Sequence, residues 1–253
     1  KIDWEIPRKT LHSSIGFLTL SLYIRGGTPQ PVIVVLTGTL AIVASADFLR
    51  FRFSTFEALY ETFLGFLMRE SEKHKINGVV WYLVGVLFAL YFYPMDIAVV
   101  AILILSWADT AASTIGRLYG RYTPALPSRV LRIPIPFVKA RYHPRLGFAS
   151  RKSTAGFMAA ALTGLVITTS FWGYFGPLRA GFDAGSASVA ASEPGMVWTW
   201  KNGSWGGLAV LGVVAGLISG VTEALDLGCL DDNLTLPILS GGAIWALAEG
   251  IRW

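Results

Sequence analysis

Long apolar blocks separated by short charged segments constrain the fold of this chain more than any other feature. A bilayer core about 30 Å thick is crossed by a helix of roughly 20 apolar residues, and a helix satisfies its backbone hydrogen bonds internally. Of the 253 residues, 53% are hydrophobic and only 15% are charged, whereas a soluble domain usually carries about a quarter charged residues. We therefore predict an all-α, polytopic transmembrane helix bundle that forms a single integral membrane domain over residues 1–253.

Two kinds of helix are expected. Seven segments are predicted to span the membrane: residues 11–24, 31–48, 78–93, 96–118, 153–176, 205–225 and 234–251. Segment 55–76 also has apolar residues at helical spacing, but Glu57, Glu61, Arg69 and Glu70 interrupt them. It is predicted to be an amphipathic helix that lies at the membrane interface.

The basic residues give this topology an orientation. The 21 Lys and Arg residues all fall on one side of the predicted membrane except Arg25, Arg179, Lys201 and Arg252. Cytoplasmic loops carry an excess of Lys and Arg. The N-terminus and the long basic segment between the fourth and fifth spans are therefore predicted to be cytoplasmic.

Cysteine and histidine exclude several kinds of site. The only cysteine, Cys229, excludes an internal disulfide and a cysteine-rich zinc site. His12, His74 and His143 are too widely scattered to suggest a metal cluster. The net charge of +5 is not accompanied by a nucleic-acid-binding motif, so no nucleic-acid partner is predicted.

Asp109 is the clearest ionisable residue within a predicted span. A charge inside the membrane costs at least about 2.5 kcal/mol and suggests function by default. Ser113 follows four residues later, so the carboxylate and the hydroxyl share one helix face, with Gly116 and Gly120 near them. Arg117 can pair with a phosphate that approaches these glycines. The alternative is a small-residue packing face that ends in a snorkelling arginine.

A group of acidic residues lies between the last two predicted spans. It comprises Glu223, Asp226, Asp231, Asp232 and Asn233. Carboxylates this close repel one another unless cations neutralise them, and hard oxygen ligands suit Mg²⁺. We predict a divalent metal site here, for Mg²⁺ or another ion such as Ca²⁺. The alternative is a solvated turn in which Asp232 and Asn233 cap the last helix.

Basic residues gather just cytoplasmic of three predicted spans. They are Arg8 and Lys9, Lys73 and Lys75, and Arg151 with Lys152 and Ser153. Lys152 and Ser153 enter a helix N-terminus, which favours anions. These side chains suit a polyphosphate, although setting topology and contacting lipid headgroups explain them equally well for most positions.

One span carries a stripe of small residues. Gly212, Gly216 and Gly220 recur at every fourth position. Such a stripe lets two membrane helices approach closely, so we predict a packing face here.

The three polar groups together resemble the parts that phosphoryl transfer requires. Basic side chains suit phosphates, acidic side chains suit metal, and Asp109 is a buried carboxylate at the membrane edge. The sequence contains no Walker or protein-kinase signature. A nucleotide site of another kind is therefore expected.

Four motifs in order resemble the membrane family of CDP-diacylglycerol synthases and CTP-dependent lipid kinases. The first is Arg8-Lys-Thr-Leu-His12, and the second runs from Asp109 to Gly120. Arg151-Lys-Ser-Thr-Ala-Gly156 and Leu230-Asp-Asp-Asn-Leu-Thr-Leu-Pro237 are the third and fourth. The compact chain and its last motif are most similar to the fungal CTP-dependent diacylglycerol kinases. Ala155 departs from the pattern, because the family often has Glu before this glycine.

The resemblance implies an activity and a set of roles. The γ-phosphate of CTP passes to diacylglycerol to give phosphatidate and CDP, in the endoplasmic reticulum and nuclear envelope membrane. Arg8, Lys9, Lys152 and Ser153 are then expected to hold the triphosphate, with Lys75, Ser113, Gly116, Arg117 and Gly120 in the same nucleotide site. Asp226, Asp231 and Asp232, with Glu223 and Asn233, are expected to hold the metal, and Asp109 to activate the lipid hydroxyl or bind metal.

Three other functions remain open at this stage. Two are enzymes of the same family, a dolichol or phytol kinase and a CDP-diacylglycerol synthase. The third is a membrane transporter, which predicts polar groups at mid-depth that are reachable from both faces.

Overall fold

The structure is a computed structural model that describes residues 6–64, 75–127, 131–132, 145–149, 152–179, 205–227 and 230–251. Its helices are α1 (Ile6–Ile24), α2 (Pro29–Arg52), α3 (Ser54–Leu64), α4 (Gly78–Phe92), α5 (Met95–Leu103), α6 (Asp109–Tyr119), α7 (Thr154–Ser170), α9 (Trp205–Ala224) and α10 (Asp232–Ile251). The π-helical turn η3 (Ile104–Ala108) joins α5 to α6, and the 3₁₀ turn η4 (Gly120–Tyr122) follows α6. A second π-helical turn, η6 (Phe171–Phe175), extends α7.

The predicted helical membrane bundle is confirmed. Four helical segments among the described residues are long and apolar enough to cross a bilayer: Pro29–Arg52, Met95–Tyr122, Thr154–Arg179 and Trp205–Ala224. Helix α4 is as apolar but has only 15 residues. The predicted spans at 11–24 and 234–251 are also helical, in α1 and α10, but these helices carry more polar residues.

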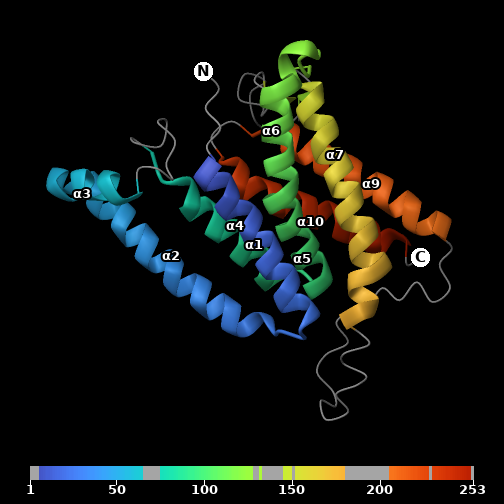
Figure 1. Cartoon of the computed structure of the whole chain (residues 1–253), viewed down its shortest axis with the longest axis horizontal. Helices are drawn as coiled ribbons and strands as arrows, with labels where there is room; N and C mark the ends of the chain where they lie inside the picture. Colours follow the sequence, from blue (N-terminus) through green and yellow to red (C-terminus); the bar gives the residue numbers. More distant parts are fainter. Residues whose placement is uncertain are drawn as a thin grey trace, which may run out of the picture.

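Helix α5 forms the centre of the bundle. All residues of the run Ile97–Leu105 are buried, whichever side of the helix they lie on, because α1, α4, α7 and α10 pack around α5 and η3. A helix that is apolar on every face is stable only when it is enclosed in this way or surrounded by lipid. Figure 1 shows α5 and α6 as one continuous column in the middle of the fold.

The predicted glycine stripe packs α9 against α7. A Cβ at Gly216 would lie 2.5 Å from the carbonyl oxygen of Ala161, and Gly164 faces Ser219 just as closely. The Ser219 hydroxyl donates to the carbonyl of Ala160. The two helices run in opposite directions, so the start of α7 lies beside the end of α9 (Figure 1).

Helices α2 and α3 form an arm that extends from the bundle (Figure 1). Most of α2 is exposed, as expected for a helix that faces lipid. A buried polar joint ties its end to the segment before α4: Arg50 lies 2.6 Å from Asp47, and the Asn77 amide N–H donates to Asp47. Helix α3 covers the first part of the predicted amphipathic segment 55–76, and residues 65–74 lie outside the described part of the chain.

A small antiparallel sheet lies beside the helix ends that begin α7 and finish α9. Its strands, in spatial order, are β1 (Leu131–Arg132), β2 (Arg145–Phe148) and β3 (Leu225–Asp226). Gly147 pairs with Asp226 across β2 and β3. Sequence patterning did not predict this sheet, which joins the long basic segment to the acidic residues after α9.

Candidate functional site

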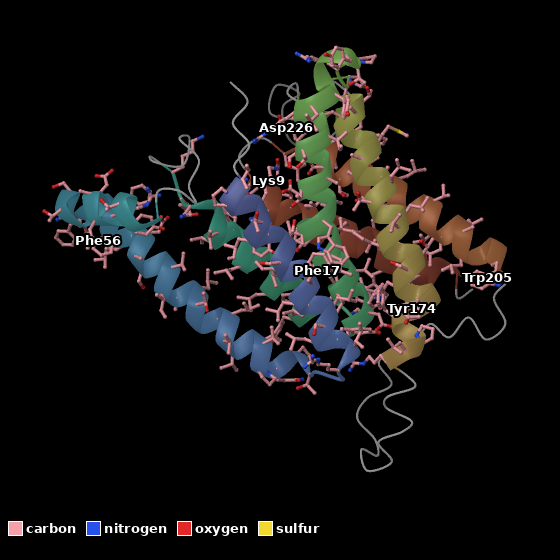
Figure 2. The ribbon with its side chains drawn as sticks, in the orientation of Figure 1. Lys9, Phe17, Phe56, Tyr174, Trp205 and Asp226 are labelled. Atoms are coloured by element: carbon pink, nitrogen blue, oxygen red, sulfur yellow. The ribbon has the colours of Figure 1, made fainter. Side chains whose placement is uncertain are left out.

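The predicted site residues lie mainly at one end of the bundle. This is the end where α1, α7 and α10 begin and where α9 finishes. Figure 2 shows Lys9 and Asp226 toward this end. Tyr174, in the turn that extends α7, and Trp205, the first residue of α9, lie away from it. Tyr174 and Trp205 are 61% and 84% exposed and mark the opposite ends of α7 and α9. Exposed aromatic residues are typical of a membrane–water interface.

Lys152 is the centre of the charged network. Its amine lies 2.5 Å from Oε1 of Glu223 and 3.4 Å from Oδ2 of Asp232. The side chain of Glu223 is only 3% exposed and that of Lys152 is 19% exposed. One cation therefore holds together the entry to α7, the end of α9 and the start of α10. A sequence pattern alone assigned these residues to two separate groups.

The electrostatic field at Lys152 is strongly negative. Burial by itself would lower the pKa of the Lys152 amine, because it disfavours the charged form. The negative charges of Glu223, Asp232 and Asp109 outweigh burial and raise this pKa above the usual 10.5. Lys152 is therefore a permanently charged ammonium at neutral pH. Asp109 belongs to the same electrostatic group although it lies on α6.

Asp109 begins α6 directly after the π-helical turn η3. Its amide N–H donates to the carbonyl of Ile104, five residues earlier. A π-helical turn inserts one residue into the helix and rotates everything that follows; such turns are frequent at functional sites. Asp109 is half-buried. The sequence predicted a carboxylate at this depth but not the turn that orients it.

Lys9 brings α1 to the same face of α6. Its ammonium donates to the hydroxyl of Ser113, and that hydroxyl donates in turn to the carbonyl of Asp109. Residues of the first and second family motifs are therefore in direct contact. Arg8, the neighbour of Lys9, is buried, and Arg117 is half-buried on α6.

Glycines let α6 contact the start of α7. A Cβ at Gly120 would lie 2.9 Å from the Ser153 hydroxyl, and one at Gly156 would lie 3.0 Å from the carbonyl of Ala112. Gly116 faces Gly156 across the same contact. The glycines of the second and third motifs therefore allow α6 and the start of α7 to pack closely.

The first turn of α7 already uses several of its N–H groups. Ser153 caps the helix by accepting from the Gly156 amide at 3.3 Å. The amides of Thr154 and Ala155 donate to the Pro124 carbonyl and the Thr123 hydroxyl. An anion near Ser153 therefore meets the ammonium of Lys152 more readily than these amides.

The acidic residues have different surroundings. Asp226 is exposed on β3, whereas Asp231 caps α10 by accepting from the Asn233 amide at 2.9 Å. Asn233 is buried, and its side chain donates to the Gly78 carbonyl. The cap that was considered for Asp232 and Asn233 is thus supplied by Asp231. Among the described residues, no three Asp, Glu, His or Cys side chains converge as a metal site.

One buried atom nevertheless fits an additional cation. Oε2 of Glu223 is buried and has no hydrogen-bond partner within the described part of the chain. An unsatisfied carboxylate oxygen inside a protein costs about 1–3 kcal/mol. Glu223 and Asp232 both contact the amine of Lys152. They are therefore the acidic pair with the chemistry to accept a divalent ion.

Lys75 is the predicted residue that the structure does not bring to this group. It is exposed at the start of the segment before α4, and its carbonyl accepts from Arg50 at 2.5 Å. The other predicted site residues lie on α1, α6, η4, α9, β3 or α10, or immediately before α7 and α10. Lys73 and Arg151, the other basic residues considered, lie outside the described part of the chain.

Three similar proteins from fungi carry the same name. The chain is 37% identical to CTP-dependent diacylglycerol kinase 1 of Eremothecium gossypii over 93% of its length, and it spans 65% of that relative. It is 36% identical to the protein of the same name from Saccharomyces cerevisiae, spanning 71% of it. The Schizosaccharomyces pombe protein of that name is 35% identical, with 96% of this chain and 93% of the relative covered.

Two broader comparisons give no match. No family model matches the sequence, and no solved structure resembles it. The three fungal relatives align with 93–96% of the chain. The resemblance predicted from the motifs is confirmed, and the chain belongs to the family of CTP-dependent diacylglycerol kinases.

Proposed function

We propose that this chain is the catalytic part of a lipid kinase that transfers the γ-phosphate of CTP to diacylglycerol, giving phosphatidate and CDP. The names of the three relatives state CTP dependence and diacylglycerol kinase activity. The arrangement of charged residues at one end of the bundle supports the extension of this activity to the chain.

A single observation carries the proposal. Lys152 lies between Glu223 and Asp232, and Asp109 adds its negative charge to the same group. Phosphoryl transfer depends on charge neutralisation and positioning rather than on covalent catalysis. In such a group the ammonium can bind a phosphate. The carboxylates can bind the divalent metal ion that accompanies a nucleotide.

The transfer reaction assigns a role to each group. The free hydroxyl oxygen of diacylglycerol attacks the γ-phosphorus of CTP, and a new oxygen–phosphorus bond forms. The bond from that phosphorus to the β–γ bridging oxygen breaks, and CDP leaves with the electron pair. The carboxylate of Asp109 accepts the hydroxyl proton and later returns it to water. Asp109 suits this role because it is half-buried at the end of an apolar helix.

The basic residues are proposed to bind the triphosphate. Lys9, on α1, contacts Ser113 of α6. Lys152, at the entry to α7, feels the charge of Asp109 at the start of α6. Arg8 and Arg117 add positive charge and Ser153 adds a hydroxyl. Gly116 and Gly120 keep α6 close to Ser153 at the start of α7. Fixed positive groups around the γ-phosphate stabilise the negative charge that its oxygens carry during transfer.

A divalent cation fits the acidic residues. Glu223, with its unsatisfied buried oxygen, and Asp232 are the residues proposed to hold it, and Asp226 is exposed nearby on β3. Mg²⁺ or Ca²⁺ supplies charge neutralisation for the phosphates of CTP. Lys152, which lies between these two carboxylates, would be the cation of this group that contacts the phosphates.

The proposed setting is the endoplasmic reticulum and nuclear envelope membrane, with the N-terminus and the site facing the cytoplasm. The distribution of Lys and Arg supports this orientation. Water-soluble CTP then reaches the charged end of the bundle while diacylglycerol stays in the adjoining bilayer.

Label position tests the proposal directly. Purified protein in nanodiscs is incubated with diacylglycerol and with CTP labelled at either the α- or the γ-phosphate. A kinase transfers the γ label to phosphatidate and leaves the α label in CDP. Transfer of the α label to lipid, with release of pyrophosphate, would instead identify a CDP-diacylglycerol synthase. Dolichol and phytol in parallel reactions establish which alcohol is phosphorylated fastest.

A further inference from the structure

A groove between α1 and α6 lies beside the proposed catalytic group. Its volume is about 420 Å³, and it is lined by one face of α1 from Ile6 to Phe17 and by Thr110 and Thr114 of α6. Lys9 also lines it, and this lysine contacts Ser113, one turn beyond Asp109. The groove therefore reaches Lys9, which is proposed to bind phosphate, and Thr110, the residue next to Asp109.

Hydroxyl groups make up most of the polar lining, and their hydrogen-bonding capacity is specific. The Thr10 hydroxyl donates to the Ile6 carbonyl at 2.9 Å, and the Thr110 hydroxyl donates to the Ser106 carbonyl at 2.7 Å. Ser14 donates to Leu11 in the same way. Each of these hydroxyls has used its only proton on the backbone and keeps lone pairs as acceptors; at Thr110 one of them already accepts from the Ser13 hydroxyl at 3.3 Å.

Lys9 supplies the complementary donor. Its ammonium has three protons, and Ser113 accepts one of them. The hydroxyl of a lipid alcohol can do both, donating to the hydroxyl wall and accepting from Lys9. A phosphate headgroup is an acceptor only, so it matches Lys9 but not the lone pairs of the wall.

The far end of the groove is apolar and open to the membrane. Phe17 is 65% exposed, and its ring packs on Trp107 at a centroid distance of 4.8 Å. Its neighbour Leu18 is 59% exposed. Phe17 comes eight positions after Lys9 on α1, a rise of about 12 Å. Figure 2 shows Lys9 near the start of α1 and Phe17 farther along the same helix. A lipid with its hydroxyl at Lys9 thus has its chains beside Phe17.

We infer that this groove is the acceptor site, which binds a neutral lipid alcohol by its free hydroxyl and directs the acyl chains past Phe17 into the bilayer. The inference rests on the proposed function, since it assigns the second substrate of the same site. It names α1 as a substrate-binding helix in addition to its phosphate-binding Lys9.

Filling the groove tests the inference by kinetics. Thr10→Phe adds bulk at an exposed position on the groove wall, and Thr39→Phe is its matched control. Thr39 is also exposed, and its hydroxyl also donates to the carbonyl four residues earlier at 2.9 Å, but it lies on the outer face of α2. Thr10→Phe is expected to raise the KM for diacylglycerol by about tenfold and leave the KM for CTP unchanged. The control leaves both constants unchanged. Equal behaviour of the two variants, or a change confined to the KM for CTP, overturns the inference.

A binding measurement separates this inference from the proposed activity. A photoreactive diacylglycerol in nanodiscs is crosslinked to the full chain without CTP, and labelled peptides are identified by mass spectrometry. Labelling of α1 and α6 that Thr10→Phe abolishes supports the groove, even if the wild-type chain fails to phosphorylate diacylglycerol. A competing diacylglycerol whose free hydroxyl is methylated cannot donate a hydrogen bond, and it is expected to compete about tenfold more weakly. Labelling elsewhere, or equal competition by the methylated lipid, contradicts the inference.

Discussion

The amine of Lys152 lies 2.5 Å from Oε1 of Glu223, and this contact joins the entry to α7 with the last turn of α9. The pair is more than a surface contact because the Glu223 side chain is almost completely buried. Removal of one partner from a buried ion pair leaves the other charge without compensation. The pair therefore stabilises the fold and also positions charge for the proposed reaction.

Lys152→Met is expected to destabilise the protein by about 3 kcal/mol, because the Glu223 carboxylate stays buried without its cation. The double variant Lys152→Met with Glu223→Gln removes both charges and is expected to recover part of this loss. Lys75→Met makes the same substitution at an exposed site and is expected to change stability by no more than about 0.5 kcal/mol. Thermal unfolding in detergent measures all three. Equal melting of Lys152→Met and Lys75→Met would contradict the role of the pair.

The pH dependence of this stabilisation has a defined direction. The negative charges around Lys152 raise its pKa in the folded state above 10.5. Stability from a lysine with a raised pKa is present in full below its unfolded value and is lost as the pH rises through the folded value. The contribution of the Lys152 charge to the unfolding free energy is therefore expected to be present in full below about pH 10 and to shrink as the pH rises further. A contribution that shrinks well below pH 9 would show that Lys152 is not held in this field.

Gly216→Ala tests the contact between α7 and α9. The new Cβ would lie 2.5 Å from the Ala161 carbonyl oxygen, so the helices must separate, at an expected cost of about 2 kcal/mol. Gly38→Ala is the matched control, since a Cβ at Gly38 meets nothing within 4 Å. The control is expected to be neutral or to stabilise α2 by up to about 1 kcal/mol through helix propensity. Denaturation of both variants in the same detergent distinguishes a specific contact from a general effect of alanine.

Lys9→Gln tests the link between α1 and α6. The substitution removes the ammonium that contacts Ser113, and we expect kcat/KM for CTP to fall by about 10²-fold. Arg25→Gln is a control at the other end of α1, where the basic residue is exposed. Steady-state kinetics of Arg25→Gln should match the wild type. A loss of activity that is equal in both variants would remove Lys9 from the site.

Sequence reasoning succeeded where structure depends on local composition. The predicted spans 78–93 and 205–225 coincide closely with α4 and α9, because their boundaries follow the change from polar to apolar residues. The span predicted at 31–48 is shorter than α2, which continues to Arg52. Asp47 and Arg50 pair three positions apart within α2. Their other partners, the Asn77 amide and the Lys75 carbonyl, lie 25 or more positions away, and contacts of that kind leave no local pattern.

The site was predicted as a set of residues but not as an arrangement. Glu223 was grouped with other acidic residues as a metal ligand, whereas the fold joins it to Lys152. Asp231 caps α10, and Asp226 belongs to a strand. These differences follow from tertiary contacts between α7, α9 and α10, which spacing along the chain does not encode. The π-helical turn before Asp109 also has no sequence signal that helical periodicity detects.

The buried helix α5 bears on the transporter alternative. An unbroken run of buried apolar residues, Ile97–Leu105, separates the charged group near Asp109 from the polar contacts at the other end of the bundle. Those contacts include Tyr23, which donates to Asp96 at 2.7 Å. A substrate path through the bundle requires polar groups along its length. The apolar run favours an enzyme that acts at one interface.

Phosphate transfer by Asp109→Asn is the measurement that tests the central claim most directly. The variant keeps the shape of the side chain but cannot accept a proton from the lipid hydroxyl. Purified wild type and variant are assayed in nanodiscs with γ-labelled CTP and diacylglycerol, and thermal unfolding verifies that both are folded. The variant is expected to melt like the wild type and to form phosphatidate at least about 10³-fold more slowly. A folded variant with activity close to that of the wild type would contradict the assignment of Asp109 as the catalytic residue of this site.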